Sequence, residues 1–137
     1  MLTVLGVLAV ILPIGLLQGV ANANGGSSSP NQVTIQPQAS YIIAGETIDV
    51  GLYVKCQGGS GEVIVNVTQS PPETPYPMQF ASGPQTVVCD GQTHTVAVTL
   101  AGFGSDAGKA WATADLTTDS LASVHAQRWI NIVVVTG

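Results

Sequence analysis

The sequence predicts an all-β protein whose antiparallel strands lie in two sheets packed face to face. From Val33 onward, apolar and polar residues alternate, and no segment has the apolar spacing that an amphipathic helix requires. Turn signals rich in glycine and proline recur roughly every eight to fifteen residues. Because each strand has one apolar and one solvated face, we expect an immunoglobulin-like antiparallel β-sandwich of about seven strands.

Each expected strand has a recognisable apolar face. In the second strand, every other residue from Ile48 to Cys56 is apolar, and in the sixth the apolar face runs from Ala110 to Leu116 and consists mostly of alanine. The closing strand places Ile130 and Ile132 inward. The strands are predicted at residues 33–35, 46–56, 62–69, 85–89, 94–100, 109–117 and 124–135.

The connections differ in length. Gln57–Gly61 is predicted to be a glycine-rich hairpin and Asp90-Gly91 a tight turn. Residues 70–84, which begin SPPETPYPMQF, form the longest connection, and we expect them to cross between the sheets because proline fixes φ and donates no backbone hydrogen bond. The larger apolar side chains of this segment are Tyr76, Met78 and Phe80. Two roles are open for them: they close one end of the core, or they face a partner.

The N-terminal segment points to export. It is apolar and uncharged, and Ala21-Asn22-Ala23 matches the small-x-small pattern of a signal-peptide cleavage site. We therefore predict a signal peptide at residues 1–23, a flexible linker at residues 24–32 and one immunoglobulin-like domain at residues 33–137. The segment lacks the usual positive charges, so an uncleaved anchor is the alternative, and only that outcome would attach the chain to a membrane. The predicted location is secreted or at the cell surface.

The two cysteines, Cys56 and Cys89, are 33 positions apart, and both follow the predicted signal peptide. In a small exported domain such a pair predicts one disulfide bond. Charge is sparse: three basic and eight acidic residues give a net charge of −5. An acidic surface repels the phosphate backbone, so we expect no nucleic-acid partner.

Three stretches with the order VGLYVKCQGGSGEVIVNVTQ, VVCDGQTHTVAVTL and GKAWATADL resemble small exported actinobacterial immunoglobulin-like domains of uncharacterised function. The resemblance covers roughly residues 33–135 and implies a β-sandwich with no assigned activity. The chain has a looser likeness to the chromophore-carrying apoproteins of the neocarzinostatin kind. Those proteins use two disulfides and a ligand crevice, whereas this chain has a single cysteine pair.

The residues that could support catalysis do not form a recognisable set. By the alternation, His94 and His125 are expected on opposite sides of the sandwich. Ser60 is followed by Gly61 and Glu62, so the final glycine of a nucleophile elbow is missing. No spacing matches a calcium loop, and a zinc site has too few donors. We therefore expect no enzyme activity, no catalytic residues, no bound metal and no cofactor.

The two tryptophans are the strongest candidates for a binding surface. Trp111 and Trp129 fall on the outer faces of consecutive strands, where they could form a cross-strand pair. They either cover a sheet face or form a platform for a sugar or a partner protein. We predict a monomeric, non-catalytic exported module with a binding or structural role and an unidentified protein or glycan partner. The alternative is a carrier that holds a small hydrophobic ligand in a crevice between the sheets.

Overall fold

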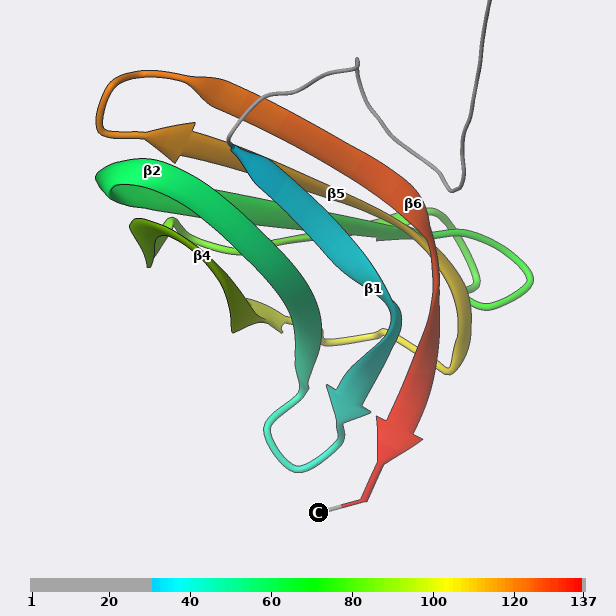
Figure 1. Ribbon diagram of the computed structural model, residues 1–137. Helices are drawn as coiled ribbons and strands as arrows, with labels where there is room; N and C mark the ends of the chain where they lie inside the picture. Colours follow the sequence, from blue (N-terminus) through cyan, green and yellow to red (C-terminus); the bar gives the residue numbers. More distant parts are fainter. Residues whose placement is uncertain (1–30, 137) are drawn as a thin grey trace, which may run out of the picture.

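The computed structural model describes residues 31–136, and these are all-β (Figure 1). The predicted signal peptide and residues 24–30 of the predicted linker lie outside the described residues. Within 31–136 there is no helix of the length and apolarity that a membrane crossing needs. The strands are β1 (Gln32–Ile42), β2 (Thr47–Gln69), β3 (Met78–Ala81), β4 (Gln85–Ala101), β5 (Gly108–Thr118) and β6 (Ser123–Val135).

The strands form one sheet that closes into a small barrel. β1 pairs antiparallel with the first half of β2 and parallel with the end of β6. β6 pairs with β5, and β5 pairs with the second half of β2, which completes the ring (Figure 1). β3 and β4 pair with β2 along its other edge. Where the register of β1 shifts between Ile35 and Ala39, the Arg128 guanidinium donates to the Ile35 carbonyl at 3.0 Å.

The prediction of an all-β chain is confirmed, but the expected seven separate strands are not observed. β2 runs through the predicted hairpin at Gln57–Gly61, and β4 runs through the predicted turn at Asp90-Gly91. Two register shifts against β4 occur between Lys55 and Gly59, where Gly58 and Gly59 have φ of 113° and 102°. Such irregularities bend a strand without reversing it. The glycine-rich stretch is therefore a bend within one long strand.

The predicted alternation correctly identifies the interior. Every second side chain of β2 from Ile48 to Cys56 and from Val63 to Val67 is fully buried, as are the inward residues of β5 from Ala110 to Leu116. Each larger apolar side chain contributes about 1.5–3 kcal/mol by leaving water. The inward residues of β5 are mostly alanine, whereas its outward residues are the larger Trp111, Thr113 and Asp115.

The proline segment does not cross between sheets as predicted. β3 pairs antiparallel with residues 66–69 of β2, so residues 70–77 are the loop of a hairpin that turns the chain back along the same strand. The backbone N–H groups of Glu73 and Thr74 both donate to the Ser70 carbonyl, which closes the loop at its start. The hairpin brings the beginning of the loop to the outer face of β2, β5 and β6.

Candidate binding surface

The outer face of β2, β5 and β6 carries the tryptophan pair predicted from the sequence. Trp111 lies directly opposite Trp129 in the β5–β6 register and opposite Thr68 of β2. The two ring centroids are 5.0 Å apart and the ring planes are inclined at 65°, an edge-to-face arrangement. Trp111 is partly buried, whereas Trp129 is 56% exposed. The pair therefore holds one large aromatic ring in place at the surface.

Lys109 adds a cation to this surface. Its ammonium group lies 4.5 Å from the centroid of the Trp129 ring, within the range of a cation–π contact. Lys109 precedes Trp111 by two residues on β5, and side chains two apart on a strand share a face. The sequence reasoning missed this role, although that spacing was a usable signal.

A shallow hollow of about 250 Å³ opens beside Trp129. We call it the Trp129 hollow, and the start of the proline loop forms one of its walls. Glu73 packs against Gly108, where an added Cβ would come within 2.7 Å of the Glu73 side chain. The residues that line the hollow are Thr68, Ser70, Pro71, Pro72, Glu73, Lys109 and Trp129.

The other three predicted surface residues behave differently from the tryptophans. Phe80 is 6% exposed and belongs to the core, so of the two roles left open for it the structure shows the one in the core and not the one on a binding surface. Inward-facing on β3, it pairs with Val67 of β2. Met78 is partly buried against the core, and Tyr76 is 62% exposed near the end of the loop. None of these three side chains lines the Trp129 hollow.

Polar side chains continue the outer face along β5 and β6. Asp115 lies opposite His125, and the imidazole Nδ1 is 2.6 Å from the Asp115 carboxylate. The ring Nε2 is 3.2 Å from the amide oxygen of Gln127. The hydrogen bond to Asp115, reinforced by Gln127, raises the pKa of His125 above its ordinary value, because both acceptors favour the doubly protonated ring.

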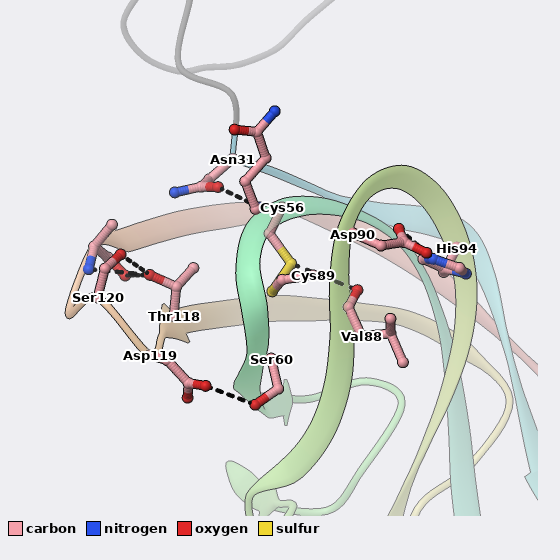
Figure 2. The surroundings of a disulfide bond; sticks show 12 residues. Asn31, Cys56, Ser60, Val88, Cys89, Asp90, His94, Thr118, Asp119 and Ser120 are labelled. Atoms are coloured by element: carbon pink, nitrogen blue, oxygen red, sulfur yellow. Dashed lines mark hydrogen bonds and ion pairs between the residues drawn. A yellow bond between two sulfur atoms is a disulfide. The ribbon is translucent and has the colours of Figure 1, made fainter.

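The predicted disulfide is present at the bends of the two longest strands (Figure 2). Cys56 and Cys89 are both buried, and their Cα atoms are 4.4 Å apart. Near the same end of the barrel, the Ser60 hydroxyl donates to Asp119 at 2.9 Å and so ties β2 to the connection between β5 and β6. The bridge therefore joins the strands where their curvature changes.

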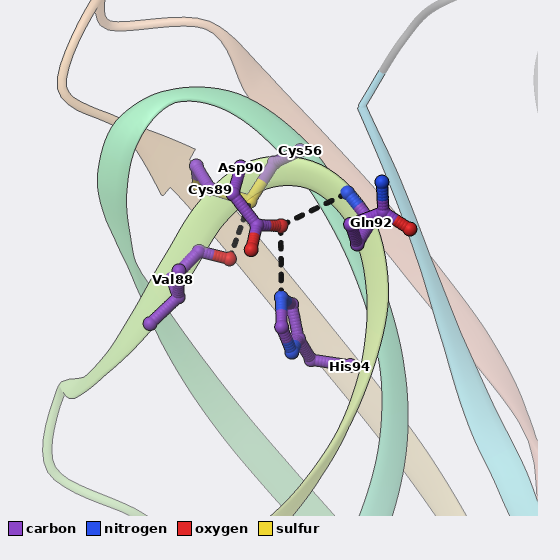
Figure 3. A network of polar contacts seen from close by, with 6 residues as sticks. All are labelled: Cys56, Val88, Cys89, Asp90, Gln92 and His94. Carbon is purple, nitrogen blue, oxygen red and sulfur yellow. Dashed lines mark hydrogen bonds and ion pairs between the residues drawn. A yellow bond between two sulfur atoms is a disulfide. The ribbon is translucent and has the colours of Figure 1, made fainter.

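His94 has a local structural role beside this bend. Figure 3 shows the Asp90 carboxylate between the Gln92 backbone N–H, at 2.9 Å, and the His94 ring, at 2.8 Å. The hydrogen bond from the Gln92 backbone N–H is the larger cause, and the contact with His94 the next, of a pKa of Asp90 that lies below its ordinary value. Within residues 31–136, no hydroxyl or thiol hydrogen-bonds to either histidine, and no three His, Cys, Asp or Glu residues gather as a metal site.

Comparison with known proteins adds little to this geometry. No protein-family model matches the chain, and no curated protein matches it. Among solved structures, a β-glucosidase from Listeria innocua is similar over 83% of the chain, with a TM-score of 0.33 and 15% sequence identity. The chain spans 17% of the length of that enzyme. A likeness this distant carries no argument about function.

Proposed function

We propose that the protein is an exported, non-catalytic module that binds a partner at the cell surface through the outer face of β2, β5 and β6. The observation that carries the proposal is the exposed Trp129 ring beside a hollow lined by polar side chains. Monomers bury most large aromatic surface, and exposed rings with adjacent polar groups are enriched at binding sites. Export is supported by the N-terminal sequence and by the disulfide.

We also propose that the barrel is a flattened immunoglobulin-like sandwich. Because β2 and β4 bend at the disulfide, their halves could belong to two layers. One layer would combine β1 with the first half of β2 and the second half of β4, and the other would combine β5 and β6 with the second half of β2. The inward side chains of β2 are fully buried and so are not open to a ligand from solvent, which favours a surface binder over a carrier with a ligand crevice.

The test compares two exposed aromatic residues on different faces. The exported protein and its Trp129→Ala and Tyr53→Ala variants are incubated with cell envelopes from the native organism, and the bound fraction is measured. Tyr53 is 45% exposed and lies on the half of β2 that pairs with β1. We expect Trp129→Ala to lose binding and Tyr53→Ala to retain it. Equal binding by Trp129→Ala and the unaltered protein would reject the proposed surface.

A further inference from the structure

We infer that the Trp129 hollow binds a pyranose ring of an uncharged glycan. This inference rests on the proposed function and names the chemical class of its partner. The outer face alone is compatible with several partners. The hollow is more specific, because beside an exposed indole it has polar side chains that form no hydrogen bond within residues 31–136. The following observations favour a sugar over a protein.

The indole offers the surface that one face of a sugar ring needs. The C–H groups on the flatter face of a pyranose are weakly positive, and the face of an aromatic ring is negative. Trp129 is held from one side by Trp111 at 5.0 Å and remains 56% exposed. The Lys109 ammonium lies over this ring, 4.5 Å from its centroid, in a cation–π contact of the same electrostatic kind that the C–H groups of a sugar would make. A sugar would stack on the exposed part of the indole, and only the Lys109 side chain, not the backbone, would need to move aside.

Three polar side chains around the indole have no hydrogen bond or ion pair within the described residues, although the Lys109 ammonium also contacts the Trp129 ring. The side chains of Ser70, Glu73 and Lys109 line the hollow, and none of them has a side-chain hydrogen bond or an ion pair within residues 31–136. A carboxylate only accepts hydrogen bonds and an ammonium group only donates them. Sugar hydroxyls do both, so one ring could satisfy both groups.

The charge and size of the hollow narrow the ligand class. One carboxylate and one ammonium group leave the hollow without net charge, which favours a neutral sugar over a phosphate or a uronate. A volume of about 250 Å³ lies just below the usual range for drug-sized ligands, roughly 300–1,000 Å³, and suits a single ring. The neighbouring outward row of Asn66, Thr113 and Gln127 offers amides and a hydroxyl to an adjoining sugar.

The loop wall is preorganised for binding. Pro71 and Pro72 have fixed φ angles, and the Ser70 carbonyl accepts the backbone N–H groups of Glu73 and Thr74 at 3.1 and 3.4 Å. Little conformational entropy is therefore lost when a ligand orders this wall. A protein interface would gain less from such a small rigid hollow, because its central anchors fill apolar pockets.

In the first test, the exported protein is titrated with oligosaccharides of glucose, mannose, galactose and N-acetylglucosamine. Binding is monitored through the NMR signal of the Trp129 indole N–H. We expect at least one of them to shift this signal. Glu73→Gln should weaken binding about tenfold because it removes a charged acceptor, and Tyr53→Ala should bind normally. If none of the four sugars shifts the Trp129 signal, the inference is wrong.

The second test separates this inference from the proposed function. Native envelopes are treated either with periodate, which cleaves sugar diols, or with protease, and binding is measured again. Loss after periodate alone supports a glycan. Suppose that protease treatment alone abolishes binding, and that binding to untreated envelopes requires Trp129. This result overturns the glycan assignment and leaves the proposed function standing.

Discussion

Trp111 on β5 and Trp129 on β6 lie directly opposite each other, with their ring centroids 5.0 Å apart. The partly buried Trp111 ring supports the exposed Trp129 ring. We therefore expect Trp111 to contribute more to stability and Trp129 more to binding. Edge-to-face aromatic pairs are worth about 0.5–1.5 kcal/mol beyond the area that they bury. This relationship gives the first of four predictions.

A double-mutant cycle on Trp111→Ala and Trp129→Ala should give a coupling free energy of about 0.5–1.5 kcal/mol. The measurement is the free energy of unfolding from urea titrations of the four proteins. Thr113 and Gln127, the next outward pair in the same register, serve as the control and should couple more weakly. Additive effects at the two tryptophans would show that the ring contact contributes nothing to stability.

Loss of the disulfide should destabilise the protein substantially. Closing a loop between cysteines 33 positions apart removes chain entropy from the unfolded state worth about 3.5–4 kcal/mol. In the double variant Cys56→Ala/Cys89→Ala, the free energy of unfolding, measured by urea titration, should be lower than in the unaltered protein by a similar amount. As a control, reduction should lower the unfolding midpoint of the unaltered protein and leave that of the double variant unchanged. An unaltered midpoint after complete reduction would contradict the prediction.

Gln69 should be the most sensitive polar residue of the fold. It is 1% exposed at the end of β2, where its amide accepts from the Ser105 hydroxyl and donates to the Asp106 carbonyl. Gln69→Met keeps the length of the side chain but leaves these groups unpaired, so unfolding should become easier by about 2–3 kcal/mol. Gln79→Met, at an exposed position on β3, is the matched control and should change stability little. Similar effects at both positions would argue against a role for the buried amide.

The ion pair between His125 and Asp115 should make stability depend weakly on pH. Since the pKa of His125 is raised in the folded protein, its contribution is fully present below the unfolded pKa of about 6.5 and is lost as the pH rises through the folded pKa. Both side chains are about half exposed, so the effect should be small and should shrink in salt. NMR titration of Asp115→Asn should show a lower His125 pKa than in the unaltered protein. An unchanged pKa would reject Asp115 as the cause.

Prediction from sequence succeeded where a local rule sufficed. The inward faces of β2 and β5 follow from alternation, because successive side chains on a strand point to opposite sides. The outward tryptophans follow from the same rule, and their contact follows because β5 and β6 are consecutive. The disulfide needed only that two cysteines be present in an oxidising compartment. Lys109 could have been added, since it shares the outward face of β5.

Prediction failed where the outcome depends on distant pairing. Gly58 and Gly59 are compatible with a turn or a bulge. A bulge forms because β4 pairs with β2 on both sides of these glycines. Residues 70–77 could cross between layers or reverse the chain, and the pairing of β3 with β2 selects the second outcome. Glu73 and Ser70 reach the hollow only because of that hairpin, so no pattern in the sequence marked them.

The sequence by itself determined which side chains of β2 and β5 face inward, which cysteines pair and on which face the two tryptophan rings emerge. These properties depend on the two-residue period of a strand and on composition, which are local. Only the tertiary structure decided that two long strands bend, that Phe80 is buried and that the proline loop lies beside Trp129. Each of those outcomes depends on hydrogen bonds between residues far apart in the chain, and a local pattern contains no information about which distant strand becomes the partner.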